Sequence, residues 1–274
     1  MKNINTAVLV VTHNSEIHIK KMVECIERQT TPPKQLIIVD SGSSNPSYLD
    51  SLQATIHKEG RDIGFAKGNN LALKLVDDEV KYILFLNPDA FLAPSFLENA
   101  ESYMEQHPDC GALTGTVLGY DIEKDHSTEL YDSTGIFQKW YGKWYDRGQG
   151  ERYDKSRFDQ NEKVPAICAA VMFCRKDALV DAMKNSQVMD ESFYMYKEDI
   201  DLSLRLQAKG WALHFVPSLL AYHCRGWSQK RRQMPHQFRL LSARNELKIH
   251  LRQQNPLKIM YSLLKYASVT TKIF

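Results

Sequence analysis

The chain has 274 residues, of which 43% are hydrophobic, and a formal net charge of +2. This length allows one large domain or one domain with an appendage, and the apolar fraction is sufficient for a sizeable core. The nearly balanced charge argues against a nucleic-acid-binding protein, which would carry a strongly basic field. The five cysteines are scattered and form no CxxC pair, which favours reduced thiols over a disulfide framework or a zinc site.

Long apolar segments are absent from the sequence. No stretch approaches the roughly 20 apolar residues that span a bilayer. The first apolar run, residues 7–11, is followed at once by polar residues and does not resemble a signal peptide. We therefore expect a cytoplasmic protein.

The first 45 residues predict a strand, a helix and a second strand. Residues 6–11 and 35–39 are apolar and rich in β-branched side chains, which is typical of buried strands. Residues 16–28 place their apolar side chains on one helical face. This order is that of a βαβ unit with a right-handed crossover. Asp40 ends the second strand, where its carboxylate could bind a nucleoside or simply stabilise a turn.

A glycine-rich segment covers residues 59–70 and precedes a helical pattern. It matches neither GxGxxG nor the Walker motif, so a Rossmann dinucleotide site is not expected. A glycine-rich loop that opens a helix still suits a phosphate-bearing ligand, because backbone N–H groups point at the ligand there.

Residues 82–86 form an apolar run that ends at Asn87-Pro88-Asp89. The run predicts a strand buried on both faces, and Pro88 prevents its continuation. Asp89 then follows the carboxyl end of a buried strand, where open α/β sheets bind ligands. Its hard oxygen ligands could hold a divalent cation against a diphosphate, although the same three residues also favour an ordinary turn.

The middle of the chain is less regular. A helix over residues 94–106 and a strand over 110–118 precede residues 119–163, which mix charged, glycine and aromatic residues without a clear period. The aromatic side chains could stack on a sugar or form a small satellite cluster under a loop. Residues 164–175 predict a return to the core, followed by a helix over 176–185.

Three acids gather at Glu198, Asp199 and Asp201, in the first turn of a helix that we expect to end at Gly210. The helix dipole favours acids there, but capping needs only one of them. A carboxylate near apolar walls has a raised pKa and is suited to accept a proton.

His223 follows a strand over 211–216 that we expect Pro217 to close. It could be a metal ligand or a structural residue.

The C-terminal part is basic and predicts helices over residues 235–253 and 256–274. The cluster Lys230-Arg231-Arg232 could grip phosphates or remain solvated. In the last helix, Lys258, Lys265 and Lys272 share one stripe and apolar residues share another. Such a helix could lie on an anionic membrane or cap the domain.

In their order along the chain, these motifs resemble those of family 2 glycosyltransferases of GT-A fold, in the bacterial rhamnosyltransferase-like branch. The resemblance covers roughly residues 5–250. It implies an α/β fold with a mostly parallel central sheet flanked by helices. It also implies a catalytic domain over residues 1–230, with a nucleotide-sugar half at 1–118 and an acceptor half at 119–230. Residues 231–274 would form a C-terminal helical extension. The motifs are Val10-Val11-Thr12-His13-Asn14, Ile38-Val39-Asp40-Ser41-Gly42-Ser43-Ser44, Asp62-Ile63-Gly64-Phe65-Ala66-Lys67-Gly68-Asn69-Asn70, Asn87-Pro88-Asp89, Glu198-Asp199-Ile200-Asp201 and His223.

The resemblance also implies the site residues and their chemistry. Asp89 and His223 would hold Mg²⁺ or Mn²⁺, and Asp199 would be the catalytic base, supported by Glu198 and Asp201. The base would deprotonate an acceptor hydroxyl, which attacks the anomeric carbon opposite the leaving diphosphate in one inverting displacement. The residues that would bind the nucleotide-diphospho-sugar are Thr12, Asn14, Asp40, Asp62, Gly64, Gly68, Asn70 and Asn87.

Two positions depart from the family pattern. Asn87 stands where the first aspartate of the DxD motif is usual, which removes one negative charge from the metal site. Arg61-Asp62 stands where Glu-Asn is more usual, which predicts altered contacts to the nucleobase of the donor.

The branch suggests dTDP-rhamnose as the donor, with a UDP-sugar as the alternative. The acceptor would be a growing polysaccharide or a lipid-linked glycan at the cytoplasmic face of the inner membrane, and the protein would contact that membrane peripherally. Two other functions are weaker. A sugar nucleotidyltransferase would need a glycine-rich, basic loop where the chain has Thr12-His13-Asn14-Ser15. A glycan- or membrane-binding scaffold would have no use for the acid cluster.

Overall fold

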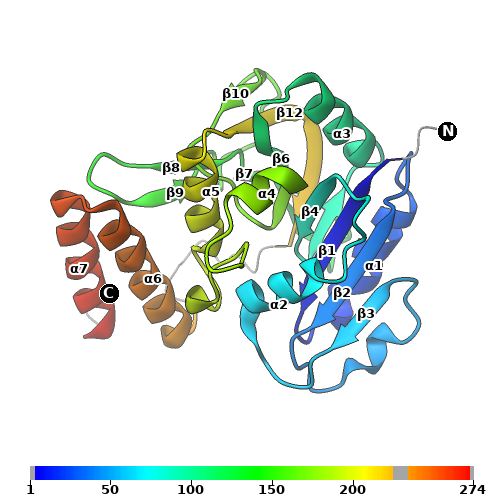
Figure 1. The fold of residues 1–274 in the computed structure, drawn as a ribbon, viewed down its shortest axis with the longest axis horizontal. Coiled ribbons are helices and arrows are strands. Elements are labelled where there is room, and N and C mark those ends of the chain that lie inside the picture. The colour runs from blue at the N-terminus through cyan, green and yellow to red at the C-terminus, as the bar shows by residue number, and fades with distance from the viewer. Residues whose placement is uncertain (1–3, 225–233, 272–274) are drawn as a thin grey trace.

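The computed structural model describes residues 4–224 and 234–271, which fold around one large mixed sheet (Figure 1). The sheet has the strand order β10-β12-β6-β11-β4-β1-β2-β3, with β5 added beside β12 and β7 beside β6. A separate hairpin is formed by β8 (Ile136–Gln138) and β9 (Trp144–Asp146). The strands of the large sheet are β1 (Thr6–Thr12), β2 (Gln35–Asp40), β3 (Thr55–Lys58), β4 (Tyr82–Leu86), β5 (Ala90–Leu92), β6 (Cys110–Asp121), β7 (His126–Ser133), β10 (Glu162–Lys163), β11 (Val171–Arg175) and β12 (Ala212–His223).

The N-terminal half of the sheet is parallel, as the predicted βαβ unit requires. Strand β1 pairs in parallel with both β2 and β4, and β2 pairs in parallel with β3. The other half is mixed, since β11 runs antiparallel between β4 and β6, while β12 is parallel to β6. The carboxyl ends of β1, β2, β4 and β12 therefore lie along the same edge of the sheet.

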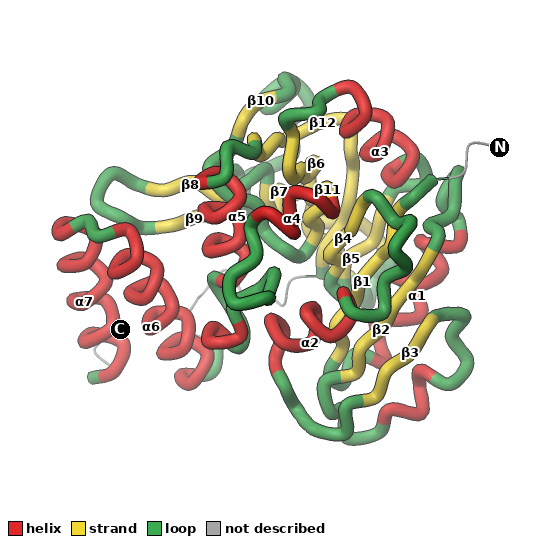
Figure 2. Tube along the Cα trace, viewed as in Figure 1, coloured by secondary structure: helices red, strands yellow, loops and turns green. Residues whose placement is uncertain are grey.

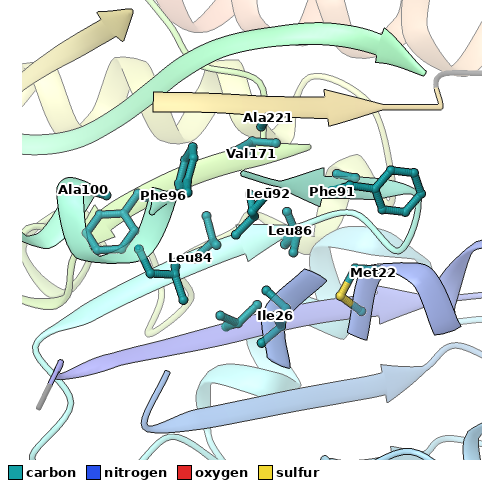
Figure 3. Close-up of a cluster of buried hydrophobic side chains, with 14 of the residues drawn as sticks. Met22, Ile26, Leu84, Leu86, Phe91, Leu92, Phe96, Ala100, Val171 and Ala221 are labelled. Atoms are coloured by element: carbon teal, nitrogen blue, oxygen red, sulfur yellow. The ribbon is translucent and has the colours of Figure 1, made fainter. Parts of the chain in front are cut away.

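Helices cover both faces of the sheet (Figures 1 and 2). Residues of β1 alternate between two cores: Val8 and Val10 belong to one, Ala7 and Leu9 to the other. Because both faces are covered, the strands appear in the sequence as continuous apolar runs. Figure 3 shows the first core, in which Met22 and Phe96 pack against the sheet. The helical segments are α1 (Glu16–Glu27), η1 (Pro46–Leu49), α2 (Gly64–Leu73), α3 (Phe96–Gln106), α4 (Lys176–Asp181), η2 (Glu191–Phe193), α5 (Glu198–Ala208), α6 (His236–Gln253) and α7 (Pro256–Thr270).

Within the glycine-rich segment, residues 59–63 form a loop and the helix α2 begins at Gly64, earlier than the sequence predicted. A Cβ atom at Gly68 would lie 2.7 Å from Cγ1 of Val11. The missing side chain therefore lets α2 approach β1 closely. This packing is sufficient to explain the glycine at position 68.

The prediction that Pro217 closes a strand is wrong, since β12 continues from Ala212 to His223. The pairing of β12 with β6 shifts register between Phe215 and Leu220, and this irregularity accommodates the proline. Strand β12 is consequently long enough to carry His223 to the carboxyl edge of the sheet.

The C-terminal helices α6 and α7 lie side by side at one end of the molecule (Figure 1). Helix α6 is not a detached appendage, because Ile249 is buried in one cluster with Trp144 and Ile200. Across the described parts of the chain, no helix is both long and apolar enough to cross a membrane.

In α7, Lys258 and Lys265 do not form the exposed stripe that the sequence predicts. Lys265 pairs with Glu246 of α6 and Lys258 donates to Gln138, so both lysines reach toward the rest of the protein. The exposed side chains of α7 are instead apolar. Lys272 and Lys230-Arg231-Arg232 lie outside the described residues. The exposed apolar residues are Leu257, Met260, Leu263 and Leu264.

Replacing Gly68 by alanine should destabilise the fold by about 1–3 kcal/mol, because the added methyl group overlaps Val11. In the double variant with Val11→Ala, the loss should be smaller than the sum of the two single losses. Urea unfolding measures all three. An unchanged free energy of unfolding combined with weaker nucleotide binding would instead assign Gly68 to a ligand site.

Candidate active site

A cavity of about 380 Å³ lies at the carboxyl edge of the sheet and gathers three of the predicted motifs. Asn87 and Asp89 come from the turn after β4, His223 ends β12, and Glu198 and Asp199 begin α5. The remaining wall is largely apolar or small. It includes Phe65, Ile136, Cys168, Ala169, Ala170 and Met195.

Backbone pairing brings Asp89 to His223. The short strand β5 runs antiparallel to β12 and pairs Ala90 with His223, and the Cys224 amide donates to the Asp89 carbonyl over 2.9 Å. As a result, Asp89 Oδ1 lies 3.3 Å from His223 Nε2. Asn87 Nδ2 lies 3.3 Å from the same ring nitrogen, although the two residues are 136 positions apart.

A buried carboxylate that sequence reasoning missed orients this histidine. Asp132 Oδ2 lies 2.8 Å from His223 Nδ1. Such a contact fixes the ring orientation and leaves Nε2 directed at Asp89. Burial lowers the pKa of His223, but the Asp89 and Asp132 carboxylates outweigh it and raise that pKa to about 9. Asp132 lies in the irregular part of the sequence, where no periodic pattern marked it.

Asp89 and His223 could together hold one divalent cation. Within residues 4–224 and 234–271, no group of three or more metal-ligating side chains occurs. One carboxylate oxygen and one imidazole nitrogen nevertheless converge at the edge of the cavity. Mg²⁺ is commonly bound by one or two carboxylates together with substrate phosphates. The residues present therefore fit a cation shared between the protein and a phosphorylated ligand.

Glu198 and Asp199 are neighbours with different surroundings. Asp199 accepts hydrogen bonds from the backbone N–H groups of Ile200 at 2.8 Å and Ala169 at 3.4 Å. Glu198 Oε2 is buried and has no hydrogen-bond partner among the residues that the structure describes. Burial raises the pKa of both side chains, and the Asp199 charge raises that of Glu198 further. Two backbone N–H groups donate to Asp199, whereas Glu198 Oε2 has no donor, so we expect Asp199 to ionise first and Glu198 to retain its proton.

Asp201 does not line the cavity. It accepts hydrogen bonds from Arg205 Nε at 2.8 Å and from Arg252 Nη1 of α6 at 2.5 Å. Arg252 also reaches Asp190 at 2.6 Å. Asp201 therefore fastens α6 to α5, and the expectation that it supports Asp199 directly is not met.

Asn245 of α6 is the second important residue that the sequence did not reveal. Its side-chain nitrogen lies 2.9 Å from each of three carbonyl oxygens, those of Phe193, Met195 and Tyr196. The turn that it binds is strained, since Tyr194, Tyr196 and Lys197 have φ values of 63°, 67° and 75°. This turn leads directly into Glu198. Asn245 consequently helps to set the position of both cavity carboxylates.

A polar network lies at the carboxyl ends of β1 and β2. Thr12 Oγ1 is 3.0 Å from the Tyr48 hydroxyl. Asp40 accepts a hydrogen bond from the Ser43 amide at 3.1 Å, and Asn14 accepts one from Ser44 at 2.8 Å. The predicted nucleoside-binding residues Thr12, Asn14 and Asp40 are thus brought together at the carboxyl edge of the sheet.

Asp62 and Gly64 join this network to the turn of residues 194–197 before Glu198, which we call the acid-bearing turn. Asp62 Oδ1 accepts hydrogen bonds from the Ser41 hydroxyl and the Gly64 amide, both at 3.0 Å. The Tyr194 hydroxyl donates to the other oxygen of Asp62. Gly64 has a φ of +77°, and a Cβ atom there would lie 2.3 Å from the Tyr194 ring. Only glycine allows this contact.

Asn70 and Gly68 do not join the predicted ligand site. Asn70 Nδ2 donates to the Met189 carbonyl at 2.7 Å, and the Met189 amide donates back to Asn70 Oδ1 at 2.9 Å. These bonds fasten α2 to the segment before η2. Both residues lie inside α2, where they serve packing.

Glu198→Gln should become progressively more stabilising relative to the wild type as the pH rises. The folded state holds the Glu198 proton more tightly than the unfolded state, so wild-type stability falls between the ordinary glutamate pKa and the raised one. Glutamine has no proton to lose. Melting temperatures should therefore be similar at about pH 5 and diverge toward about pH 9.

The matched control is Glu27→Gln, which changes an exposed glutamate at the end of α1. Its melting temperature relative to the wild type should not depend on pH in this way. A constant difference for Glu198→Gln would show that Glu198 ionises normally in the fold.

The chain is similar in sequence to one protein family and to rhamnosyltransferases of two bacteria. The family model described as "Glycosyl transferase family 2" matches residues 7–179. Rhamnosyltransferase WbbL of Escherichia coli (strain K12) is 27% identical over 230 residues, covering 79% of this chain and 82% of WbbL. An N-acetylglucosaminyl-diphospho-decaprenol L-rhamnosyltransferase of Mycobacterium tuberculosis (strain CDC 1551 / Oshkosh) is 23% identical over 251 residues, covering 84% of this chain and 79% of that protein.

Solved structures show the fold. The chain matches GalNAc-T7 with UDP, GalNAc and Mn²⁺ at a TM-score of 0.65 and 12% identity, covering 91% of this chain but 48% of that one. It thus spans about half of GalNAc-T7. The mannosyltransferase PcManGT of Pyrobaculum calidifontis, in complex with GDP-Man and Mn²⁺, matches at a TM-score of 0.61 and 16% identity, covering 98% and 70% of the two chains.

The sheet and helices are those of the expected GT-A fold. The family match covers more than half of the chain and supports a glycosyltransferase over the nucleotidyltransferase and scaffold alternatives. The chain belongs to the family 2 glycosyltransferases and is itself a glycosyltransferase, with relatives in the rhamnosyltransferase-like branch.

Proposed function

We propose that this enzyme transfers rhamnose from dTDP-rhamnose to a hydroxyl group of a lipid-linked glycan, with inversion at the anomeric carbon. The observation that carries the proposal is the convergence of Asp199 with Asp89 and His223 in one cavity. The names of the two rhamnosyltransferase relatives support the sugar, and that of the mycobacterial relative supports a diphospho-lipid acceptor.

Asp199 is the base in this proposal. It is the ionised member of the carboxylate pair, and burial raises its pKa toward the range useful for accepting a proton. As Asp199 takes the hydroxyl proton, the acceptor oxygen attacks the anomeric carbon. The bond from that carbon to the diphosphate breaks on the opposite face, and dTDP leaves. Glu198 stays protonated beside Asp199, so the negative charge of Asp199 does not face a second carboxylate charge.

Mg²⁺ or Mn²⁺, held by Asp89 and His223, would neutralise the negative charge that develops on the leaving diphosphate. Asn87 adds a polar group beside His223 without adding charge. Mn²⁺ accompanies the nucleotide in the GalNAc-T7 and PcManGT complexes, which supports divalent-metal use here.

The nucleoside lies, in this proposal, over the polar network of Thr12, Asn14 and Asp40, with Asp62 and Gly64 at its margin. The division into a catalytic domain over residues 1–230 and an extension over 231–274 belongs to the proposal too. Its sequence boundary does not mark independent units, because α6 supplies contacts to the acid-bearing turn.

The proposal also includes peripheral contact with a membrane that holds the acceptor. Its support is the exposed apolar face of α7.

A panel of nucleotide sugars, added with and without Mn²⁺ in a thermal-shift assay, tests the donor. A ligand present at about 100-fold its dissociation constant should stabilise the fold by roughly 2.7 kcal/mol. We expect a metal-dependent shift with dTDP-rhamnose. A shift with UDP-sugars alone would overturn the donor, and no shift with any nucleotide sugar would overturn the proposal.

Asp199→Asn and Glu198→Gln are the matched variants for this test. Asp199→Asn should keep the donor-induced shift and lose about 10²- to 10⁴-fold in transfer rate, because it removes the base. Glu198→Gln should retain most of the rate, since glutamine resembles the protonated glutamate. The reverse order of losses would assign the base to Glu198.

Asn245→Ala should lower kcat by about 10- to 100-fold while the KM for the donor stays near that of the wild type, because the acid-bearing turn moves but the nucleoside network does not. Asn245→Asp should be worse, since a carboxylate would face three carbonyl oxygens.

Initial-rate kinetics and melting temperatures distinguish positioning from folding. Arg244→Ala, at the exposed neighbouring position of α6, is the control and should change neither. A rise in donor KM in step with the fall in kcat, or equal effects of alanine and aspartate at position 245, would contradict the positioning role.

A further inference from the structure

A second and larger cavity of about 660 Å³ lies between the β8–β9 hairpin and the helices α6 and α7. We call it the α6–α7 groove. Its walls are mainly apolar, with Met234, Tyr261 and Leu264 among the lining residues. The Tyr141 and Tyr261 rings, whose centroids are 5.1 Å apart, join the hairpin to α7 along one wall.

The groove adjoins the candidate active site. Ser242 of α6 lines both the groove and the active-site cavity. Lys143 lines the groove and also a smaller cavity of about 210 Å³. That smaller cavity shares Ile136, Asp146 and Lys197 with the active site. The three cavities are therefore adjacent, with Ser242 and Lys143 at their borders.

Positive charge lies between the active site and the apolar part of the groove. Lys143 and Lys197 line the smaller cavity together with Asp146, which leaves one net positive charge there, and Lys143 also lines the groove. Arg239 and Lys265 also line the groove, and Lys265 is paired with Glu246. A molecule with phosphates next to an apolar chain matches this order of charges and apolar walls.

The outer end of the groove opens on exposed apolar side chains. Leu264 lines the groove and is 66% exposed. Leu257 and Met260 extend the same face of α7 outward, and Trp140 on the hairpin is 79% exposed. Leucine and methionine beside an exposed indole suit the interface of a membrane. An apolar chain leaving the groove would pass directly over this face.

We propose that the α6–α7 groove binds the apolar chain of a lipid-diphosphate acceptor. Lys143 faces the acceptor's diphosphate, and the sugar beyond it reaches Asp199. The chain continues over Leu264 into the membrane. This assignment rests on the proposed function only in taking the acceptor to be lipid-linked; it does not depend on which sugar is transferred.

Calorimetric titration with farnesyl diphosphate, in the presence of Mn²⁺ and saturating dTDP to block the donor site, tests the groove directly. The wild type should bind farnesyl diphosphate at least about tenfold more tightly than inorganic diphosphate, because only the former has an apolar chain. Leu264→Glu should abolish that advantage. Ile17→Glu, at a 71% exposed position on α1, should preserve it.

Equal binding of farnesyl diphosphate and inorganic diphosphate would overturn the proposal. An undiminished advantage in Leu264→Glu would also overturn it. If the wild type instead self-associates in sedimentation, fails to bind farnesyl diphosphate and becomes monomeric in Leu264→Glu, the groove is an interface between two copies.

Kinetics separate this proposal from the proposed function. With a long-chain acceptor, Leu264→Glu should lower kcat/KM at least about tenfold, whereas a short-chain, water-soluble acceptor should react as in the wild type. Equal losses with both acceptors would overturn the groove assignment. Farnesyl diphosphate binding without transfer from dTDP-rhamnose would overturn the donor and leave the groove assignment standing. Transfer of rhamnose to a soluble glycan, without binding of farnesyl diphosphate, would overturn the groove assignment and leave the donor standing.

Discussion

The antiparallel pairing of Ala90 with His223 is the contact on which the candidate site depends. It brings the end of one strand and the turn after another into hydrogen-bonding distance, and Asp89 and His223 meet as a consequence. A slip of one residue in this register would direct the His223 side chain to the opposite face of the sheet. The irregular pairing around Pro217 gives β12 the length that the contact requires.

A second constraint is the strained turn that leads into α5. Three residues with left-handed backbone conformations precede Glu198, and each of them costs free energy that the surrounding structure must offset. Asn245, together with the ion pairs of Arg252 to Asp190 and Asp201, holds this turn from the side of α6. The C-terminal helices therefore have two uses in our interpretation: α6 positions the carboxylates, and the groove between α6 and α7 receives the acceptor chain.

Glu198 and Asp199 differ in protonation in our interpretation because their surroundings differ. Glu198 and Asp199 are adjacent in sequence; Glu198 is buried and Asp199 is partly buried. The backbone N–H groups of Ile200 and Ala169 point only at Asp199, so the negative charge is held there.

The sequence by itself determined the parallel strands β1, β2 and β4, the polar residues at their ends, and the family, because apolar runs, turn residues and motif order are local features of the chain. It also placed Asp89, Glu198 and Asp199 near strand and helix ends, but it ended the strand at Pro217, and only the structure carries β12 on to His223. Only the tertiary structure decided that Asp132 and Asn245 serve the site and that Asp201, Gly68 and Asn70 serve packing. Asp132 and His223 are 91 positions apart, and Asn245 and Tyr196 are 49 apart. Contacts across such separations depend on strand register and helix packing, which leave no periodic pattern in the sequence.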